Sequence, residues 1–297
     1  MKVLVTGGGG FLGAWVARRL LAKDVAVRIF DASADRFNVD TIVGDRAANI
    51  EWVVGDVGNP DDVSRAMAGC DHVVHLAGLL TPACQDNPVR GATVNVIGTI
   101  NVFEAAKQHG LTNVVYTSSV SVFGPENGDL PNPSTHYGAF KLAAEGSARS
   151  YWEYDGISSV GLRPGVVYGP GRESGLSAGP TLACKAAVQG NEYTMGYTGD
   201  ACLVYVDDVA AAYEYAVLTP PKGAHVFNVS GSPISTDTVI QEIKKHYPAV
   251  SLKTSGSTLP FTAHISDLEL YKTFPSLTRT DLDVGIRETL DHYEALA

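Results

Sequence analysis

The chain has 297 residues, enough to bury the core of one large α/β unit or of two modest domains. Hydrophobic residues make up 45% and charged residues 18%, which is ordinary for a soluble globular protein and argues against disorder. Lys and Arg number 22 against 32 Asp and Glu, a formal net charge of −10 without any run of basic residues. This balance disfavours binding to nucleic acid or to an anionic membrane surface, because both need clustered cations.

Four cysteines, Cys70, Cys84, Cys184 and Cys202, are widely spaced and lack a Cys-x-x-Cys pair or a histidine at metal-binding spacing. We therefore expect buried free thiols in a reducing compartment and no metal site. The chain enters an apolar segment at once, with no signal-peptide pattern and no run long enough to span a bilayer. A cytoplasmic location is the expectation.

A glycine cluster follows the first apolar run, residues 3–5, and precedes a helical pattern over residues 14–23. Gly7 suits a tight turn off a strand, Gly10 allows a phosphate to approach the backbone, and Gly13 allows the helix to pack close to the sheet. A helix N-terminus at this point offers free N–H groups to an anion. Strand, glycines and helix together predict a dinucleotide phosphate cradle.

The second predicted strand, residues 25–30, ends on Asp31, close to the spacing of a ribose-binding acid. A carboxylate there accepts hydrogen bonds from ribose hydroxyls and repels a 2′-phosphate, so NAD is favoured over NADP. A turn-forming aspartate is the alternative. Arg28 and Arg36 lie nearby in the sequence and leave room for NADP.

Two further predicted strands end at candidate cofactor contacts. Residues 51–57 place Asp56 near the adenine amino group and Val57 against its ring, or Asp56 is a bare turn residue. Residues 71–78 bring small side chains to the carboxyl end of a strand, where an open parallel sheet binds its ligand. His75, inside that strand, is expected to be a packed, hydrogen-bonded histidine rather than a catalytic base.

A helical pattern over residues 90–109 leads to a fifth strand, residues 113–117, which ends in Thr117, Ser118 and Ser119. Alternating strands and helices of this length predict right-handed crossovers. The fold class expected is α/β, a Rossmann-type doubly wound parallel sheet with a small C-terminal substrate-binding lobe. Residues 1–165 form the predicted NAD-binding domain, and residues 166–297 form mainly the lobe, with some segments returning to the first domain.

Tyr137 and Lys141 open a helix predicted to run to about Tyr154, and four-residue spacing puts both on one face. A phenol with a pKa near 10 needs a neighbouring cation to act as a base at neutral pH. We expect Tyr137 to exchange a proton with a substrate oxygen, Ser119 to hold that oxygen, and Lys141 to favour the phenolate and anchor the nicotinamide ribose.

The order of these elements resembles the extended short-chain dehydrogenase/reductase family, of the NAD-dependent epimerase/dehydratase type. The resemblance covers nearly the whole chain and rests on Thr6-Gly-x-x-Gly10-x-x-Gly13, Asp31, Asp56, Ala77-Gly78, Asn95-x-x-Gly98-Thr99, Ser119, Tyr137-x-x-x-Lys141 and Arg163-Pro164-Gly-Val-Val-Tyr168-Gly-Pro. It implies Ser119 as the catalytic serine, with Ser118 and Ser121 as neighbours. It also implies a homodimer formed by the helices around residues 90–109 and 137–154.

Combined with the residue patterns, the resemblance gives three sets of candidate site residues. The catalytic residues expected are Ser119, Tyr137 and Lys141. The residues expected to bind NAD are Gly7, Gly10, Phe11, Leu12, Asp31, Asp56, Val57, Leu76, Ala77, Gly78, Asn95, Thr117, Tyr137, Lys141, Pro164 and Val167. The residues expected to bind substrate are Ser119, Ser121 and Arg172.

Two departures from the family pattern bear on the reaction. Dehydratases of the family carry Asp-Glu at the catalytic serine, where this chain has Val120-Ser121, so dehydration is disfavoured. Epimerases that bind a nucleotide diphosphate usually present an arginine shortly before the segment matching Val206-Asp207-Asp208. Residues 200–205 contain none.

The last third of the chain is short for a nucleotide-sugar enzyme. Residues 169–181 form a glycine-rich loop in which Arg172 either pairs a carboxylate or phosphate or is a solvated charge. Helices over residues 207–218, 235–246 and 281–296 and a strand over 225–229 are predicted, with Asp207 and Asp208 in a capping role. Tyr193, Tyr197 and Tyr205 either line the pocket or pack in the core.

The favoured function is an NAD-dependent oxidoreductase that transfers a hydride to or from a hydroxyl or keto carbon of a small sugar, sugar-acid or polyol-like substrate. The main alternative is a nucleotide-sugar epimerase with tightly bound NAD. A non-catalytic NAD-sensing protein is a third alternative, disfavoured because a sensor needs no catalytic base.

Overall fold

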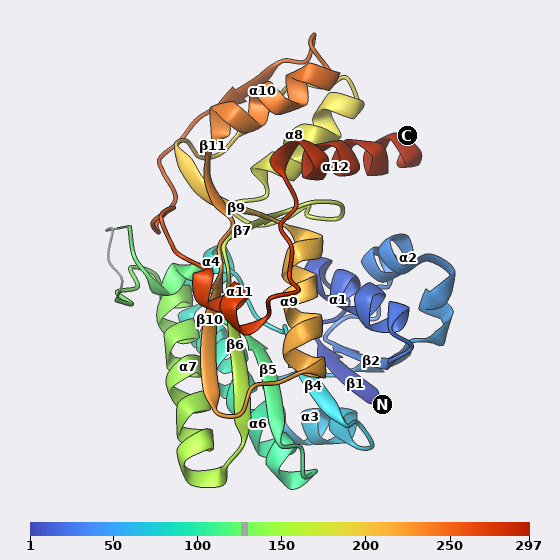
Figure 1. Ribbon diagram of the computed structural model, residues 1–297, viewed down its shortest axis with the longest axis vertical. Helices are drawn as coiled ribbons and strands as arrows, with labels where there is room; N and C mark the ends of the chain where they lie inside the picture. Colours follow the sequence, from blue (N-terminus) through green and yellow to red (C-terminus); the bar gives the residue numbers. More distant parts are fainter. Residues whose placement is uncertain (126–129) are drawn as a thin grey trace.

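The computed structural model describes residues 1–125 and 130–297. Figure 1 shows a larger layered part, built around one sheet, and a smaller lobe that carries the C-terminus. None of the helices in the described ranges is long and apolar enough to cross a membrane.

Seven parallel strands form the large sheet, in the order β10-β6-β5-β4-β1-β2-β3. They are β1 (Lys2–Thr6), β2 (Ala26–Asp31), β3 (Glu51–Val54), β4 (His72–His75), β5 (Asn113–Thr117), β6 (Ser158–Pro164) and β10 (Ala224–Val229). The chain order reverses at β1, which lies between β2 and β4, so the carboxyl ends of these strands border the ligand crevice of an open α/β sheet. The parallel sheet confirms the predicted Rossmann-type fold.

Helices cover both faces of this sheet (Figure 1). One face carries α1 (Phe11–Ala22), α2 (Phe37–Val43) and α9 (Val206–Leu218), and a 3₁₀ turn, η1 (Gly44–Asn49), follows α2. The other carries α3 (Pro60–Met67), α6 (Gly98–Gln108) and α7 (His136–Asp155), and a short 3₁₀ turn, η3 (Val120–Val122), lies between β5 and α7. With a helix layer on each face, the strands read as apolar runs, as Val3, Leu4 and Val5 of β1 do.

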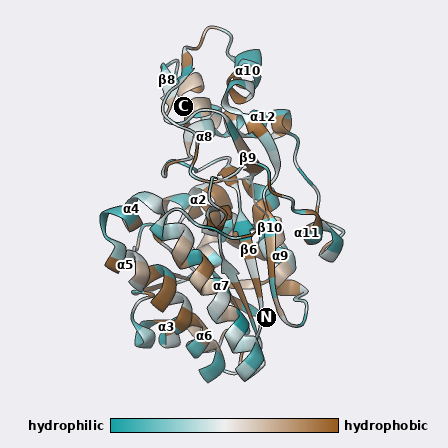
Figure 2. Ribbon diagram, turned by 90° about the vertical axis from the view of Figure 1, so that its left-hand side faces the viewer, coloured by the Kyte–Doolittle hydropathy of each residue, from teal (hydrophilic) through white to brown (hydrophobic). Residues whose placement is uncertain are grey.

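The smaller lobe contains two short sheets and three main helices. β7 (Val166–Tyr168), β9 (Asp200–Tyr205) and β11 (Ser232–Ser235) form one sheet, and β8 (Tyr193–Met195) pairs with β12 (Leu252–Thr254). Figure 2 shows α8 (Gly179–Val188), α10 (Thr236–His246) and α12 (Leu282–Leu296) above the large sheet, each with hydrophilic and hydrophobic residues. A short helix, α11 (Leu268–Thr273), packs near β10.

The chain crosses between the two parts more than once. It enters the lobe with β7, comes back through α9 and β10, and then leaves again to β11. Arg19 of α1 fixes α9 in place by ion pairs with Asp207 and Glu214, each at 2.8 Å. The predicted domain boundary at residue 165 stays a prediction.

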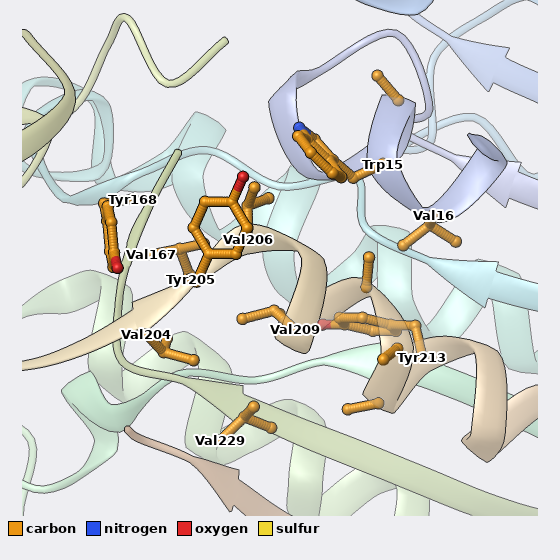
Figure 3. Close-up of a cluster of buried hydrophobic side chains, with 14 of the residues drawn as sticks. Trp15, Val16, Val167, Tyr168, Val204, Tyr205, Val206, Val209, Tyr213 and Val229 are labelled. Atoms are coloured by element: carbon orange, nitrogen blue, oxygen red, sulfur yellow. The ribbon is translucent and has the colours of Figure 1, made fainter. Parts of the chain in front are cut away.

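A buried aromatic cluster joins the lobe to the start of α1 (Figure 3). Trp15 of α1 lies edge-on to Tyr205 of β9, with ring centroids 6.1 Å apart, and its indole N–H donates to the Pro170 carbonyl at 3.0 Å. Tyr168 of β7 tilts against the same Tyr205 ring at 5.5 Å. Because α1 begins at the glycine cluster, this packing holds the lobe in a defined position over the predicted phosphate cradle.

The helix predicted over residues 90–109 is present as one continuous helical stretch from residue 88 to 108, with a π-helical turn inside it. α4 (Thr81–Asp86) precedes α5 (Pro88–Ala92), a π-helical turn, η2 (Thr93–Ile97), follows, and α6 begins at Gly98. The Asn95 amide donates to the Gly91 carbonyl at 3.1 Å, and the Thr93 hydroxyl donates to the Val89 carbonyl at 2.9 Å. These side chains engage carbonyls four residues back, which is a recognised cause of local helix distortion.

The capping role predicted for Asp207 and Asp208 is wrong. Tyr205 precedes α9, and no side chain caps the helix there. Asp208 instead accepts hydrogen bonds from the Thr280 N–H at 2.8 Å and the Thr280 hydroxyl at 2.7 Å, while Asp207 pairs with Arg19. Both carboxylates have long-range partners.

All four cysteines are buried and free, as expected.

Candidate active site

A cavity of about 560 Å³ lies at the carboxyl ends of the parallel strands, beneath the lobe. Its wall is built from the β1–α1 turn, the residues after β2, β3, β4 and β5, the start of α7, and two lobe segments around residues 164–177 and 259–261. It therefore forms where an open α/β sheet binds a dinucleotide.

The glycine turn is shaped to leave room for a ligand. Gly7 has φ +67°, and a Cβ there would lie 2.6 Å from the Ala77 nitrogen. A Cβ on Gly13 would lie 2.5 Å from the Gly8 Cα, so α1 can approach the turn only without a side chain. Gly10 meets only one atom, the Gly7 oxygen at 3.3 Å, and it lines the cavity just before α1 begins. A pyrophosphate fits this cradle, with the first N–H groups of α1 as donors.

Asp31 lies on the cavity wall at the end of β2, as expected of a ribose-binding acid. Its Oδ2 accepts the Gly9 N–H and its Oδ1 accepts the Ser33 N–H, both at 3.0 Å. These bonds fix the carboxylate in the turn while leaving lone pairs for ligand hydroxyls.

Arg28 and Arg36, which could have bound the 2′-phosphate of NADP, have other partners, and neither lines the cavity. Arg28 pairs with Glu51 at 2.7 Å and donates to the Ala66 and Ala68 carbonyls. Arg36 stacks on Trp52, donates to the Ala47 carbonyl and pairs with Asp40.

Asp56 and Val57 also lie on the wall, near the Asp31 end of the cavity. Asp56 accepts the Gly58 N–H at 2.8 Å and pairs with Arg90 at 3.0 Å. Arg90 is on the cavity wall too, and no sequence pattern singled it out.

Ser119 and Tyr137 meet at the other end of the cavity. Ser119 follows β5, and Tyr137 is the second residue of α7, whose N-terminus is capped by the Thr135 hydroxyl accepting the Gly138 N–H at 3.1 Å. The Ser119 hydroxyl lies close enough to the Tyr137 phenol to lower its pKa. The phenol and the serine therefore present two adjacent hydroxyl groups to anything bound there.

Lys141 is buried behind this wall. Its Nζ donates to the Thr117 carbonyl at 2.9 Å and lies 5.6 Å from the centre of the Tyr137 ring. Asn95 is buried beside it, and a Cβ on Gly78 would lie 2.7 Å from the Asn95 Oδ1 and 3.3 Å from the Lys141 Nζ. Thus Gly78 separates Lys141 and Asn95 from the cavity.

The charges at this end differ from the expectation of a depressed phenol pKa. Burial raises the pKa of Tyr137, against the lowering effect of the Ser119 hydroxyl and the Arg172 charge. Burial lowers the pKa of Lys141 to about 8. Ser119 and Arg172 favour the phenolate, but burial outweighs them, and the remaining predicted contribution is the positive charge of the oxidised nicotinamide.

His75 is a packed core histidine, as predicted. Its two ring nitrogens lie 2.7 Å from the Thr6 Oγ1 and 3.1 Å from the Thr99 Oγ1. Burial, with the Lys141 charge adding to it, lowers its pKa to about 3. A neutral imidazole with both nitrogens hydrogen-bonded stabilises the packing between β1, β4 and α6 and is not free to act as a base.

An ion pair behind Ser119 has no counterpart in the sequence-based prediction. Arg163 of β6 binds Glu145 of α7 through two hydrogen bonds of 2.7 and 2.6 Å. The Ser118 hydroxyl donates to the same carboxylate. Ser118 lies on the wall together with Ser119 and Ser121, and its hydroxyl is engaged by the Glu145 carboxylate.

Of the predicted site residues, all but Asn95 and Lys141 lie on the cavity wall. Tyr193, Tyr197 and Tyr205 do not; Tyr197 and Tyr205 are buried in the lobe. Apolar side chains at the Tyr137 end escaped the sequence-based prediction, among them Leu80, Leu176 and Phe261. They come from three distant segments, so no local pattern marks them.

The comparisons with known proteins agree with this geometry. Residues 3–230 match the model of the NAD dependent epimerase/dehydratase family. The chain is 32% identical over 251 residues to the UDP-glucose 4-epimerase of Mycolicibacterium smegmatis, covering 80% of this chain and 79% of that protein. It is also 32% identical over 260 residues to human 3 beta-hydroxysteroid dehydrogenase type 7, covering 77% and 68% of the two chains.

Among solved structures, the UDP-glucose 4-epimerase of Thermus thermophilus in complex with NAD superposes with a TM-score of 0.87. The two chains are 26% identical, and the match covers 100% of each.

Proposed function

The chain belongs to the NAD dependent epimerase/dehydratase family, and from that premise we propose that it is an oxidoreductase acting on a hydroxyl or keto carbon of a small sugar, sugar-acid or polyol-like substrate. Its cofactor is NAD, which supplies the hydride acceptor when bound. The observation that carries the proposal is that Ser119 and Tyr137 lie together on the wall of a cavity that begins at the glycine cradle.

The chain's own groups divide the work in the oxidative direction. Ser119 holds the substrate oxygen, and Tyr137 takes its proton as the carbon–hydrogen bond breaks. Lys141, anchored on the Thr117 carbonyl, places a positive charge behind the phenol as it loses its proton. In the reductive direction Tyr137 returns the proton to the carbonyl oxygen.

The cations on the cavity wall support a dehydrogenase over a nucleotide-sugar epimerase. Arg90 is paired with Asp56 at the Asp31 end, which leaves Arg172 as the unpaired arginine on the wall in the described ranges. β9, which directly precedes Val206, Asp207 and Asp208, contains no arginine.

An epimerase remains the second candidate because of the likeness to the Mycolicibacterium smegmatis UDP-glucose 4-epimerase. In such an enzyme the same tyrosine serves oxidation and re-reduction, and no reduced cofactor accumulates. A non-catalytic NAD-sensing protein is the third, and the retained Ser119–Tyr137 pair speaks against it.

The experiment is absorbance at the NADH band with NAD and a panel of sugars, sugar acids, polyols and UDP-glucose. A Tyr137→Phe variant is the control, with NAD binding followed by quenching of tryptophan fluorescence. We expect NADH to form with the wild type and to be lost in the variant, with NAD affinity retained. Conversion of UDP-glucose without NADH would instead establish the epimerase, and full activity in the variant would remove Tyr137 as the base.

We further propose a homodimer through the helices around residues 90–109 and 137–154, which the family resemblance assigns to the contact. These helices carry exposed apolar side chains, Ile97 on the first and Tyr154 on the second. Sedimentation of the wild type against an Ile97→Glu variant tests it: the wild type should run as a dimer and the variant as a monomer.

A further inference from the structure

Arg172 is an arginine on the wall of the active-site cavity that has no partner of opposite charge. Its Nε is shut off from solvent and makes no hydrogen bond, and none of its nitrogens pairs with a carboxylate in the described ranges. The other two arginines in or beside the site are paired, Arg90 with Asp56 and Arg163 with Glu145. A desolvated guanidinium without a counter-charge is unfavourable, so its environment is incomplete without an anion.

The loop that carries Arg172 is held at its base. The Arg172 N–H donates to the Gly169 carbonyl at 3.2 Å, and the Gly169 N–H donates to the buried Thr181 hydroxyl of α8 at 3.0 Å. The guanidinium lies over the Phe11 ring, with Cζ 5.6 Å from its centre. These contacts hold the charge over the cavity.

The nearest acid in sequence is turned away from it. Glu173 pairs with Lys185 of α8 at 2.8 Å and accepts the Tyr293 hydroxyl at 3.3 Å. Glu173 therefore has partners on α8 and α12, whereas Arg172, the next residue toward the cavity, has no partner of opposite charge.

Two anions are candidates for this guanidinium. One is a carboxylate of the substrate. The other is the pyrophosphate of NAD, because Arg172 lies over Phe11 and Phe11 directly follows the glycine cradle. The guanidinium extends toward Leu80: a Cβ on Gly175 would lie 3.1 Å from the Arg172 Nη2 and 3.2 Å from the Leu80 Cδ1. From there its charge also acts on the Tyr137 phenol, so it lies toward the reacting end.

Leu80 and Leu176 are 38% and 47% exposed on the wall, and among the described residues the only other cation on the wall is Arg90, which is paired with Asp56. One free arginine suits a single carboxylate, which it can bind through two parallel hydrogen bonds.

We propose that Arg172 binds the carboxylate of the substrate, and that the enzyme therefore oxidises hydroxy acids or reduces oxo acids. This rests on the proposed hydride transfer and narrows its substrate to an acid whose carboxylate lies within reach of Arg172 when its hydroxyl meets Tyr137.

The test compares acids with neutral analogues of the same shape. A panel of 2- and 3-hydroxy acids, sugar acids included, is assayed for NADH formation beside the corresponding primary amides. The variants are Arg172→Gln and Arg172→Lys, with Arg65→Gln as control, because Arg65 is an exposed α3 arginine away from the cavity and its loss changes the net charge equally.

We expect Arg172→Gln to lower kcat/KM for the acid about 100-fold and to leave the amide within about threefold, since charge-assisted hydrogen bonds to the carboxylate are lost. Arg172→Lys should recover part of the loss, and Arg65→Gln should resemble the wild type. NAD affinity should stay unchanged. An equal loss for acid and amide, together with weaker NAD binding, would assign Arg172 to the pyrophosphate and overturn the substrate carboxylate.

A binding measurement separates this inference from the proposed reaction. In the NAD-loaded protein, a hydroxy acid should raise the midpoint of thermal unfolding in the wild type and not in Arg172→Gln, while its amide should do so in neither. If NADH never forms but this acid-specific stabilisation is seen, the proposed oxidation fails and the carboxylate site stands. If NADH forms from amides as readily as from acids, the oxidation stands and the carboxylate site is wrong. Absence of acid-specific stabilisation also overturns the site.

Discussion

Glu145 and Arg163 form a buried bidentate ion pair that joins α7 to β6, two helical turns beyond Tyr137. The Ser118 hydroxyl donates to the same carboxylate, so the pair also holds the residue before Ser119. The helix that carries the phenol and the strand end that carries the serine are therefore fixed to a common anchor. We regard both residues as positioning residues rather than catalytic ones.

Loss of one member of this pair should be costly. Glu145→Gln leaves a buried guanidinium without its counter-charge, and we expect the free energy of unfolding to fall by about 3–5 kcal/mol. Glu269→Gln is the control, because its partner Lys272 and Glu269 itself are both largely exposed, and a change of less than about 1 kcal/mol is expected. Urea denaturation measures both; equal effects in the two variants would contradict the anchor.

The buried charge of Lys141 should lower the free energy of unfolding. Burial holds its pKa at about 8, below the ordinary value of 10.5, so between these pH values the unfolded chain binds more protons than the folded one. The free energy of unfolding then rises with pH across this window, and the full cost is present below pH 8.

Lys141→Met removes that charge while keeping the length of the side chain. We expect the free energy of unfolding at pH 7 to increase by about 1–3 kcal/mol, the rise between pH 8 and 10.5 to become shallower, and turnover to be lost. Urea denaturation at pH 7 and at pH 9.5 tests this. A less stable variant at pH 7 would mean that the Thr117 carbonyl already compensates the ammonium.

The turn at Gly7 should tolerate no side chain. Gly7→Ala brings a Cβ to 2.6 Å from the Ala77 backbone nitrogen at φ +67°, so we expect a loss of roughly 2–4 kcal/mol in unfolding free energy and at least tenfold weaker NAD binding. Gly146→Ala is the matched control on α7, where a Cβ meets nothing within 4 Å. That variant should gain up to about 1 kcal/mol. Similar destabilisation in both would contradict the steric argument.

Asp31 should set the preference for NAD. Arg28 and Arg36 are engaged with Glu51 and Asp40, so no free arginine of this pair faces a 2′-phosphate. Asp31→Ala should weaken NAD about tenfold and NADP less, measured by fluorescence titration of both cofactors. Asp45→Ala, an exposed acid on the turn η1, provides the control. An unchanged ratio of the two affinities would remove Asp31 as the discriminating group.

Local signals in the sequence determined the architecture of the large sheet and much of the site. The apolar run into Gly7, the acid that ends β2 and the four-residue spacing of Tyr137 and Lys141 each depend on backbone geometry within a few residues. Their order along the chain matched that of the family, which gave each motif an expected role. Every predicted site residue except Asn95 and Lys141 lies on the cavity wall, although their roles still await the experiments above.

The tertiary structure alone decided which charges are paired. Asp208 lies 72 residues from its partner Thr280, and Glu145 lies 18 residues from Arg163 on a different element. Burial decided that Tyr137 has a raised pKa and Lys141 a lowered one, and packing of distant segments left Arg172 without a partner. Desolvation and long-range pairing depend on which segments meet, and only the folded chain brings those segments together.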